Sequence, residues 1–178
     1  MADPSSPDGA LGLIAGGGDL PPAVAQSVRA AGRGVFVVAM SGSVTDPWVK
    51  EFPHAFISPG EPGRTIKAFE QAGVREVLLV GRVDRPKFSE LKLDAKGVLL
   101  LPKAIAAAKR GDDALLRFIV GICEDAGFKA VSVAQAAPDL VTGEGALGRI
   151  EPNETARADI EAALRIVHAL GAMDVGQA

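Results

Sequence analysis

The chain has 178 residues, of which 48% are hydrophobic, a formal net charge of −3 and a single cysteine, Cys123. This length allows one ordinary domain plus a piece, or two small domains, with enough apolar side chains to bury a core. The charge gives no electrostatic reason to expect nucleic acid as a partner, and one cysteine excludes an internal disulfide and a cysteine-rich zinc site. The apolar stretches are too short to span a bilayer, so any membrane role would be peripheral.

Residues 1–10 contain Pro, Ser, Asp and Gly without the basic-then-apolar pattern of a signal peptide, and we expect them to form a flexible tail. Apolar runs and helical spacing then predict strands and helices in alternation. The predicted strands are 11–15, 35–40, 54–58, 76–81 and 129–134. Helices are predicted from Leu20 to Gly32, over 62–72 and 98–108, and between Asp113 and Gly127, where Cys123 falls on the apolar face.

The strands are apolar on both faces, and helices separate most of them. This pattern predicts an α/β fold with a Rossmann-like parallel sheet and helices on both faces, over residues 11–137. Residues 138–150 are rich in glycine and predict a linker. Residues 151–178 form a helix followed by a strand-like stub, so we expect the truncated start of a second, C-terminal domain.

A glycine loop, Gly16-Gly17-Gly18-Asp19, follows the first predicted strand and precedes a helix. In doubly wound folds this is where phosphate binds, because glycine lets the backbone approach the anion and free N–H groups of the next helix point at it. The alternative is a plain tight turn in which Asp19 caps the helix. A dinucleotide is disfavoured, because Pro21 replaces the third glycine and no acid follows the second strand.

A basic segment leaves the fourth predicted strand at the same edge of the sheet: Gly81-Arg82-Val83-Asp84-Arg85-Pro86-Lys87. Arg82, Arg85 and Lys87 are suited to clamping phosphate oxygens, and the alternative is a solvated loop with unrelated charges. Further along, Asp112 and Asp113 are adjacent carboxylates that could bind Mg²⁺ with waters completing the shell. The alternative is that Asp112 caps a helix and Asp113 favours its positive end.

Three motifs together carry a family resemblance. They are Leu13-Ile14-Ala15-Gly16-Gly17-Gly18-Asp19-Leu20-Pro21, then Gly111-Asp112-Asp113-Ala114-Leu115-Leu116-Arg117, then Asp174-Val175-Gly176-Gln177-Ala178. In this order they resemble the UDP-2,3-diacylglucosamine pyrophosphatases of the LpxI type, over nearly the whole chain after the tail.

The resemblance implies a Gram-negative enzyme of lipid A biosynthesis at the cytosolic face of the inner membrane. Such enzymes use Mg²⁺ to hydrolyse UDP-2,3-diacylglucosamine to UMP and 2,3-diacylglucosamine 1-phosphate, and hold the lipid between two domains. The main catalytic acid of the family is expected beyond Ala178, so we expect little or no hydrolysis by these residues alone. A homo-oligomer is left open.

The predicted site residues combine these motifs with the basic segment. Substrate-binding residues are predicted at Gly16, Gly17, Gly18, Asp19, Gly81, Arg82, Lys87 and Arg117, and metal ligands at Asp112 and Asp113. The apolar stretch from Val98 to Leu101 could line a route for acyl chains or form an ordinary buried helix. Two further functions stay open: a non-catalytic nucleotide or sugar-nucleotide binding module, and, less favoured, an NAD-dependent oxidoreductase domain.

Overall fold

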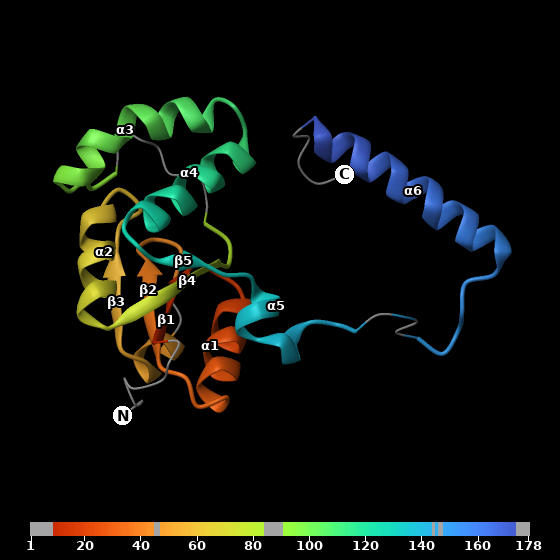
Figure 1. Ribbon diagram of the computed structural model, residues 1–178, viewed down its shortest axis with the longest axis horizontal. Helices are drawn as coiled ribbons and strands as arrows, with labels where there is room; N and C mark the ends of the chain where they lie inside the picture. Colours follow the sequence, from red (N-terminus) through yellow and green to blue (C-terminus); the bar gives the residue numbers. More distant parts are fainter. Residues whose placement is uncertain (1–8, 45–46, 84–90, 144, 146–147, 174–178) are drawn as a thin grey trace.

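The computed structural model describes residues 9–44, 47–83, 91–143, 145 and 148–173. A five-stranded sheet with all strands parallel lies at its centre, in the order β3-β2-β1-β4-β5 (Figure 1). The strands are β1 Ala10–Ala15, β2 Val35–Met40, β3 His54–Ile57, β4 Val74–Val80 and β5 Lys129–Ala130. The helices are α1 Leu20–Ala30, α2 Pro62–Gln71, α3 Ala95–Ala108, α4 Asp112–Asp125, α5 Val133–Ala136 and α6 Glu154–Ala172, with 3-10 helices η1 Pro47–Glu51 and η3 Pro138–Leu140.

One face of the sheet is covered by α1, η1 and α5. Leu11, Leu13 and Val37 alternate toward this face and are fully buried. They pack in one cluster with Val24 and Val28, which recur four residues apart and so lie on the same side of α1. Removing these side chains from water supplies the main driving force for this layer.

The opposite face is covered by α2 and α4. Val38, Val77 and Cys123 are buried there around the ring of Phe69, which confirms that the cysteine belongs to the core. An added methyl on Gly12 of β1 would lie 2.9 Å from this ring, so glycine in the strand makes room for the phenyl group. Helices on both faces confirm the predicted α/β, Rossmann-like class.

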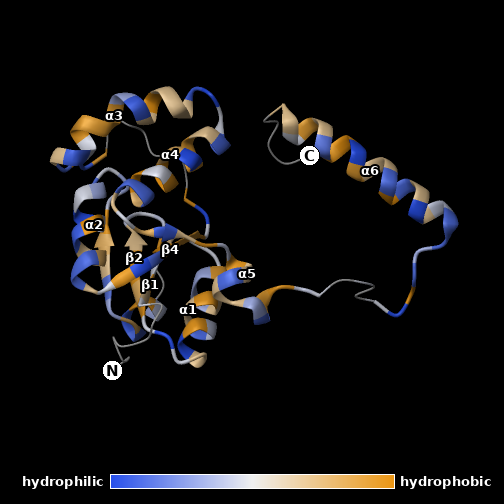
Figure 2. Ribbon diagram, in the orientation of Figure 1, coloured by the Kyte–Doolittle hydropathy of each residue, from blue (hydrophilic) through white to orange (hydrophobic). Residues whose placement is uncertain are grey.

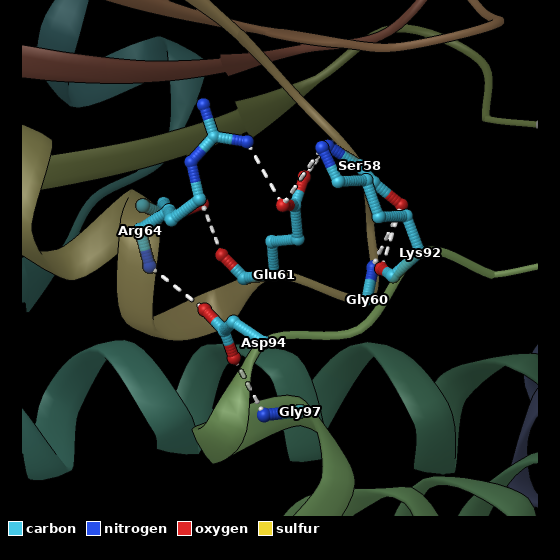
Figure 3. A network of polar contacts seen from close by, with 8 residues as sticks. Ser58, Gly60, Glu61, Arg64, Lys92, Asp94 and Gly97 are labelled. Atoms are coloured by element: carbon cyan, nitrogen blue, oxygen red, sulfur yellow. Dashed lines mark hydrogen bonds and ion pairs between the residues drawn. The ribbon is translucent and has the colours of Figure 1, made fainter.

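An ion cluster around the buried carboxylate of Glu61 joins the start of α2 to the segment before α3 (Figure 3). Glu61 has a side chain only 5% exposed, paired with Arg64 at 2.8 Å and with Lys92 at 3.7 Å. Asp94 accepts hydrogen bonds from the amide of Gly97, at 2.7 Å, and from the amide of Arg64, at 2.9 Å. One carboxylate therefore satisfies N–H groups in the first turns of two helices, α3 and α2.

The same junction brings two backbones into contact. An added methyl on Gly97 would lie 2.0 Å from the carbonyl oxygen of Gly60, so α3 can begin here only with glycine at this position. Because Gly60 lies shortly after β3, this contact places the start of α3 beyond the carboxyl end of that strand. Figure 1 shows α3 lying past the arrowheads of β2 and β3.

The strand predicted over 129–134 is wrong beyond Ala130. The Ser132 amide donates to the side-chain oxygen of Gln135 at 2.9 Å, and the Gln135 amide donates to the Ser132 hydroxyl at 3.3 Å. This reciprocal pair is a capping box, which starts α5 inside a run of apolar residues. The local hydrogen bonds outweigh the β-favouring valines on either side of Ser132.

Two predicted boundaries also move. Ala10 is part of β1 and not of the predicted tail, whose residues 1–8 lie outside the described residues. At the other end, Asp139 accepts a hydrogen bond from the Ser27 hydroxyl of α1. Since Ala137 is fully buried in the core, η3 belongs to the packed body, and the predicted linker begins after it.

Helix α6 lies apart from the sheet (Figure 1). Figure 2 shows hydrophobic and hydrophilic residues alternating along it, and none of its residues is buried. Three apolar residues of this helix are exposed to solvent within the described part of the chain: Ile160, Leu164 and Val167. No helix among the described residues is long and apolar enough to cross a membrane.

The pKa of Glu61 makes the stability of the fold depend on pH. Burial raises the pKa of Glu61, but the hydrogen bonds from Arg64 and the Ser58 amide and the nearby positive charges outweigh it, so the pKa lies below the ordinary 4.5. A lowered pKa stabilises the fold fully above about pH 4.5, and this contribution is lost as the pH falls through the folded-state pKa. We expect Glu61→Gln to lower the free energy of unfolding by about 2 kcal/mol at pH 7, and by progressively less below pH 4.5, in urea titrations across this range.

The matched control is Glu51→Gln, which removes a half-exposed ion pair with Arg29 and should cost less than about 0.5 kcal/mol at any pH. If the wild-type and Glu61→Gln stabilities stayed parallel down to acid pH, the ion cluster would not be the source of the acid sensitivity.

Candidate functional site

The loops that follow β1 and β4 are hydrogen-bonded to each other at the carboxyl edge of the sheet. The Gly17 amide donates to the Arg82 carbonyl and the Arg82 amide to the Gly17 carbonyl, both at 2.8 Å. The Gly16 amide donates to the Val80 carbonyl, also at 2.8 Å. This is the point where the strand order reverses, and open α/β sheets bind ligands in the crevice at that point.

Glycine is required in both loops because their backbones touch. An added methyl would lie 2.5 Å from the Arg82 carbonyl oxygen at Gly16, and 2.8 Å from the Ser43 carbonyl oxygen at Gly17. Gly81 has a φ of 92°, and a methyl there would lie 2.7 Å from the Pro21 ring. The absence of side chains at Gly16, Gly17 and Gly81 therefore allows three loops to pack closely against one another. The amides of Gly16 and Gly17 are not available to an anion, because both donate hydrogen bonds within the fold.

The amides that remain for a ligand come next in the chain. For the N–H groups of Gly18, Asp19 and Leu20 no acceptor is found among the described residues. Pro21 and Pro22 follow and have no N–H group, so these three amides carry the positive end of α1. Among the described residues, nothing lies within 4 Å of a methyl added at Gly18, so the space beside this residue is open.

Asp19 stands at the N-cap position of α1, but its carboxylate accepts no hydrogen bond from the helix. Asp19 therefore takes the N-cap position that the alternative expected, but its side chain does not make the capping hydrogen bond. The side chain is exposed, and Arg82, on the loop bonded to Gly17, is exposed as well. The structure thus brings together the three free amides, a carboxylate and a guanidinium side chain at one edge of the sheet, which we call the rim site: Gly18, Asp19, Leu20 and Arg82.

The other predicted residues gather at the start of α4. Asp112 and Asp113 are exposed in its first turn, and the N-cap is Gly111, so the interpretation of Asp112 as the cap is wrong. Both carboxylates lie at the positive end of the helix, and Asp113 pairs with Arg117 at 2.7 Å. No cluster of three metal-ligating side chains occurs within the described ranges.

Sequence reasoning missed two cations near Arg117. Lys103 and Arg110 line a concavity between α3 and α4 together with Arg117. The available signal was a seven-residue spacing between the three, which was hidden by the helix break at Gly111. Lys87, the neighbouring Arg85 and the motif at 174–178 lie outside the described residues.

The sequence model of the LpxI N-terminal domain family matches residues 10–140. The UDP-2,3-diacylglucosamine pyrophosphatase LpxI of Caulobacter vibrioides is 40% identical over 167 residues, which is 94% of this chain and 59% of that protein. The chain thus spans less than two thirds of the length of this relative.

Substitutions of Gly16, where the two loops touch, and of Gly121, in an open part of α4, should have opposite effects on stability. Gly16→Ala should destabilise the fold by about 2 kcal/mol, because its methyl must push the two loops apart. Gly121→Ala, inside α4 with nothing within 4 Å, should stabilise it by about 0.5 kcal/mol or more, because alanine favours helix. Chemical unfolding of both variants measures the difference, and a neutral Gly16→Ala would show that the loops are not in contact.

Proposed function

The chain belongs to the LpxI family, and on this premise we propose that it supplies the phosphate-binding part of a UDP-2,3-diacylglucosamine pyrophosphatase. The reaction would be hydrolysis of the pyrophosphate to UMP and 2,3-diacylglucosamine 1-phosphate, in lipid A biosynthesis. The observation that carries the proposal is a set of three amides, at Gly18, Asp19 and Leu20, that have no acceptor among the described residues and lie beside Arg82 at the switch point of the sheet. The relative's name supplies the substrate.

In this proposal the rim site holds the diphosphate. The three amides donate hydrogen bonds to its oxygens, and the Arg82 guanidinium neutralises charge that builds up as the bond between phosphorus and the bridging oxygen breaks. The Asp19 carboxylate, which the helix does not use, would accept a hydrogen bond from a substrate hydroxyl. Gly16, Gly17 and Gly81 act indirectly, because they hold the loops that carry these groups.

A Mg²⁺ ion is part of the proposal, with Asp112 and Asp113 as its protein ligands. Mg²⁺ binds one or two carboxylates and fills its remaining positions with water and phosphate oxygens, and the two adjacent, exposed carboxylates fit this donor set. One oxygen of Asp113 contacts Arg117, which leaves its second oxygen for a metal. When bound, the ion would neutralise phosphate charge and lower the pKa of a bound water. Arg117 would then hold Asp113 in place and contact the substrate.

We extend the proposal to the lipid and to its location at the cytosolic face of the inner membrane. Val98 is 57% exposed and Leu99 is 77% exposed, so the interpretation of this stretch as an ordinary buried helix is wrong for these two residues. Exposed apolar side chains near the start of α3 would contact acyl chains, because both would leave water.

The rim site is tested by substituting two arginines separately: Arg82, which follows β4, and Arg75, near the start of that strand. We expect Arg82→Gln to weaken binding of UDP-2,3-diacylglucosamine to this chain roughly tenfold in calorimetric titrations, because a charge-assisted hydrogen bond to phosphate is lost. Arg75→Gln, which alters an exposed arginine at the opposite end of the strand, should leave the affinity unchanged. Equal affinities of wild type and Arg82→Gln would exclude the rim site as the diphosphate site.

The catalytic part of the proposal is tested in a fusion of this chain to the portion of the Caulobacter relative that it does not cover. We expect Mg²⁺-dependent release of UMP, followed by phosphorus NMR, and a loss of at least about tenfold in turnover for Asp113→Asn with little change in thermal stability. Chelation of the metal should stop the reaction. Saturable binding without hydrolysis in the fusion would instead favour the non-catalytic sugar-nucleotide binding module.

A further inference from the structure

A concavity lies between α3 and α4, and it is formed by different elements from those of the rim site. Its volume is about 430 Å³, which is in the range of small-molecule sites. Three alanines, Ala106, Ala107 and Ala114, line it with small side chains. Larger residues at these positions would fill the space between the two helices.

The remaining lining is cationic and aromatic: Lys103, Arg110, Arg117 and Phe118. Arg117 is paired with Asp113, whereas Lys103 and Arg110 make no ion pair or hydrogen bond with side chains in the described part of the chain. Three cations around one concavity repel one another, and one carboxylate offsets only part of that charge. The concavity therefore holds a local excess of positive charge in a protein whose net charge is −3.

We propose that this concavity binds the phosphate group of a phosphorylated small molecule. Arginine presents paired N–H groups that match phosphate oxygens, and lysine adds a point charge. The Phe118 ring and the alanine methyl groups provide an apolar wall for whatever the phosphate is attached to. The size of the concavity and the acidic balance of the whole chain disfavour nucleic acid, which needs an extended basic surface.

The concavity shares Arg117 with the proposed Mg²⁺ and substrate site, but Lys103, Arg110 and Phe118, which are not part of that site, also line it. The rim site is formed by the loops after β1 and β4, whereas the concavity is formed by two helices and their connection. The phosphate could belong to a soluble ester or to a lipid headgroup, since both present the same dianion.

The test is an NMR titration of the uniformly nitrogen-15-labelled chain with glucose 1-phosphate, in which amide shifts report where the ligand binds. We expect saturable shifts in the amides of residues 103–118. Arg110→Gln and Lys103→Gln should each raise the dissociation constant read from these amides about fivefold or more. The matched control is Lys109→Gln, because Lys109 is exposed next to Arg110 but does not line the concavity; its dissociation constant should change less than about twofold. Thermal unfolding checks that all three variants fold.

A second experiment distinguishes the sources of phosphate by sedimentation with phosphatidylcholine vesicles that contain or lack phosphatidic acid. Retention that requires phosphatidic acid and is lost in Arg110→Gln identifies a lipid headgroup, and titration by glucose 1-phosphate alone identifies a soluble ester. The proposal is overturned if neither probe binds saturably, or if Lys109→Gln weakens binding as much as Arg110→Gln. Because shifts at residues 18–20 report the rim site separately, either site can fail without the other.

Discussion

The backbone contact between the loops after β1 and β4 determines how this molecule can hold a ligand. Gly16, Gly17 and Gly81 lie where the loops are too close together to leave room for a side chain. The Gly17–Arg82 bridge and the bond from Gly16 to Val80 then use the amides that a phosphate would otherwise accept from. The two loops are therefore joined at the carboxyl edge of the sheet. The N–H groups without an acceptor among the described residues are those of the next three residues, Gly18, Asp19 and Leu20. The position of Arg82 follows from the same bridge, because its backbone is one of the two partners.

The junction between α2 and α3 depends on hydrogen bonds and ion pairs. Asp94 accepts from the first turns of α2 and α3, and Glu61 holds Arg64 and Lys92 across the same junction. These interactions fix where α3 starts, and α3 in turn packs against α4. The concavity between the two helices and the exposed start of α3 are thus consequences of a cluster of charges beyond the carboxyl end of β3. Acid weakens the stabilisation that such a charge cluster provides, because its carboxylates become protonated. The apolar core on the two faces of the sheet has no such dependence on pH.

The two proposed anion-binding sites use different physical means. The rim site offers backbone amides and the positive end of a helix, which suit an anion that approaches the backbone closely. The α3–α4 concavity offers flexible cationic side chains around an aromatic ring, which suit a phosphate attached to a partly apolar group. A phosphorylated amphiphile would satisfy the second arrangement, and a nucleotide diphosphate the first.

The sequence by itself determined the fold class, the alternation of strands and helices and the location of the glycine loop, because buried strands and amphipathic helices leave periodic patterns that depend only on neighbours along the chain. It also contained the capping box at Ser132 and Gln135, which a reading by apolar runs passed over. Tertiary structure alone decided which amides of the loop are used within the fold. The amides of Gly16 and Gly17 donate to the carbonyls of Val80 and Arg82, which lie at and just after the end of a strand far along the chain. It likewise decided that Asp19 leaves its helix uncapped, and that Lys103, Arg110 and Arg117 converge across a helix break. Hydrogen-bond partners and charge clusters of this kind depend on distances between remote residues, and a linear pattern does not record those distances.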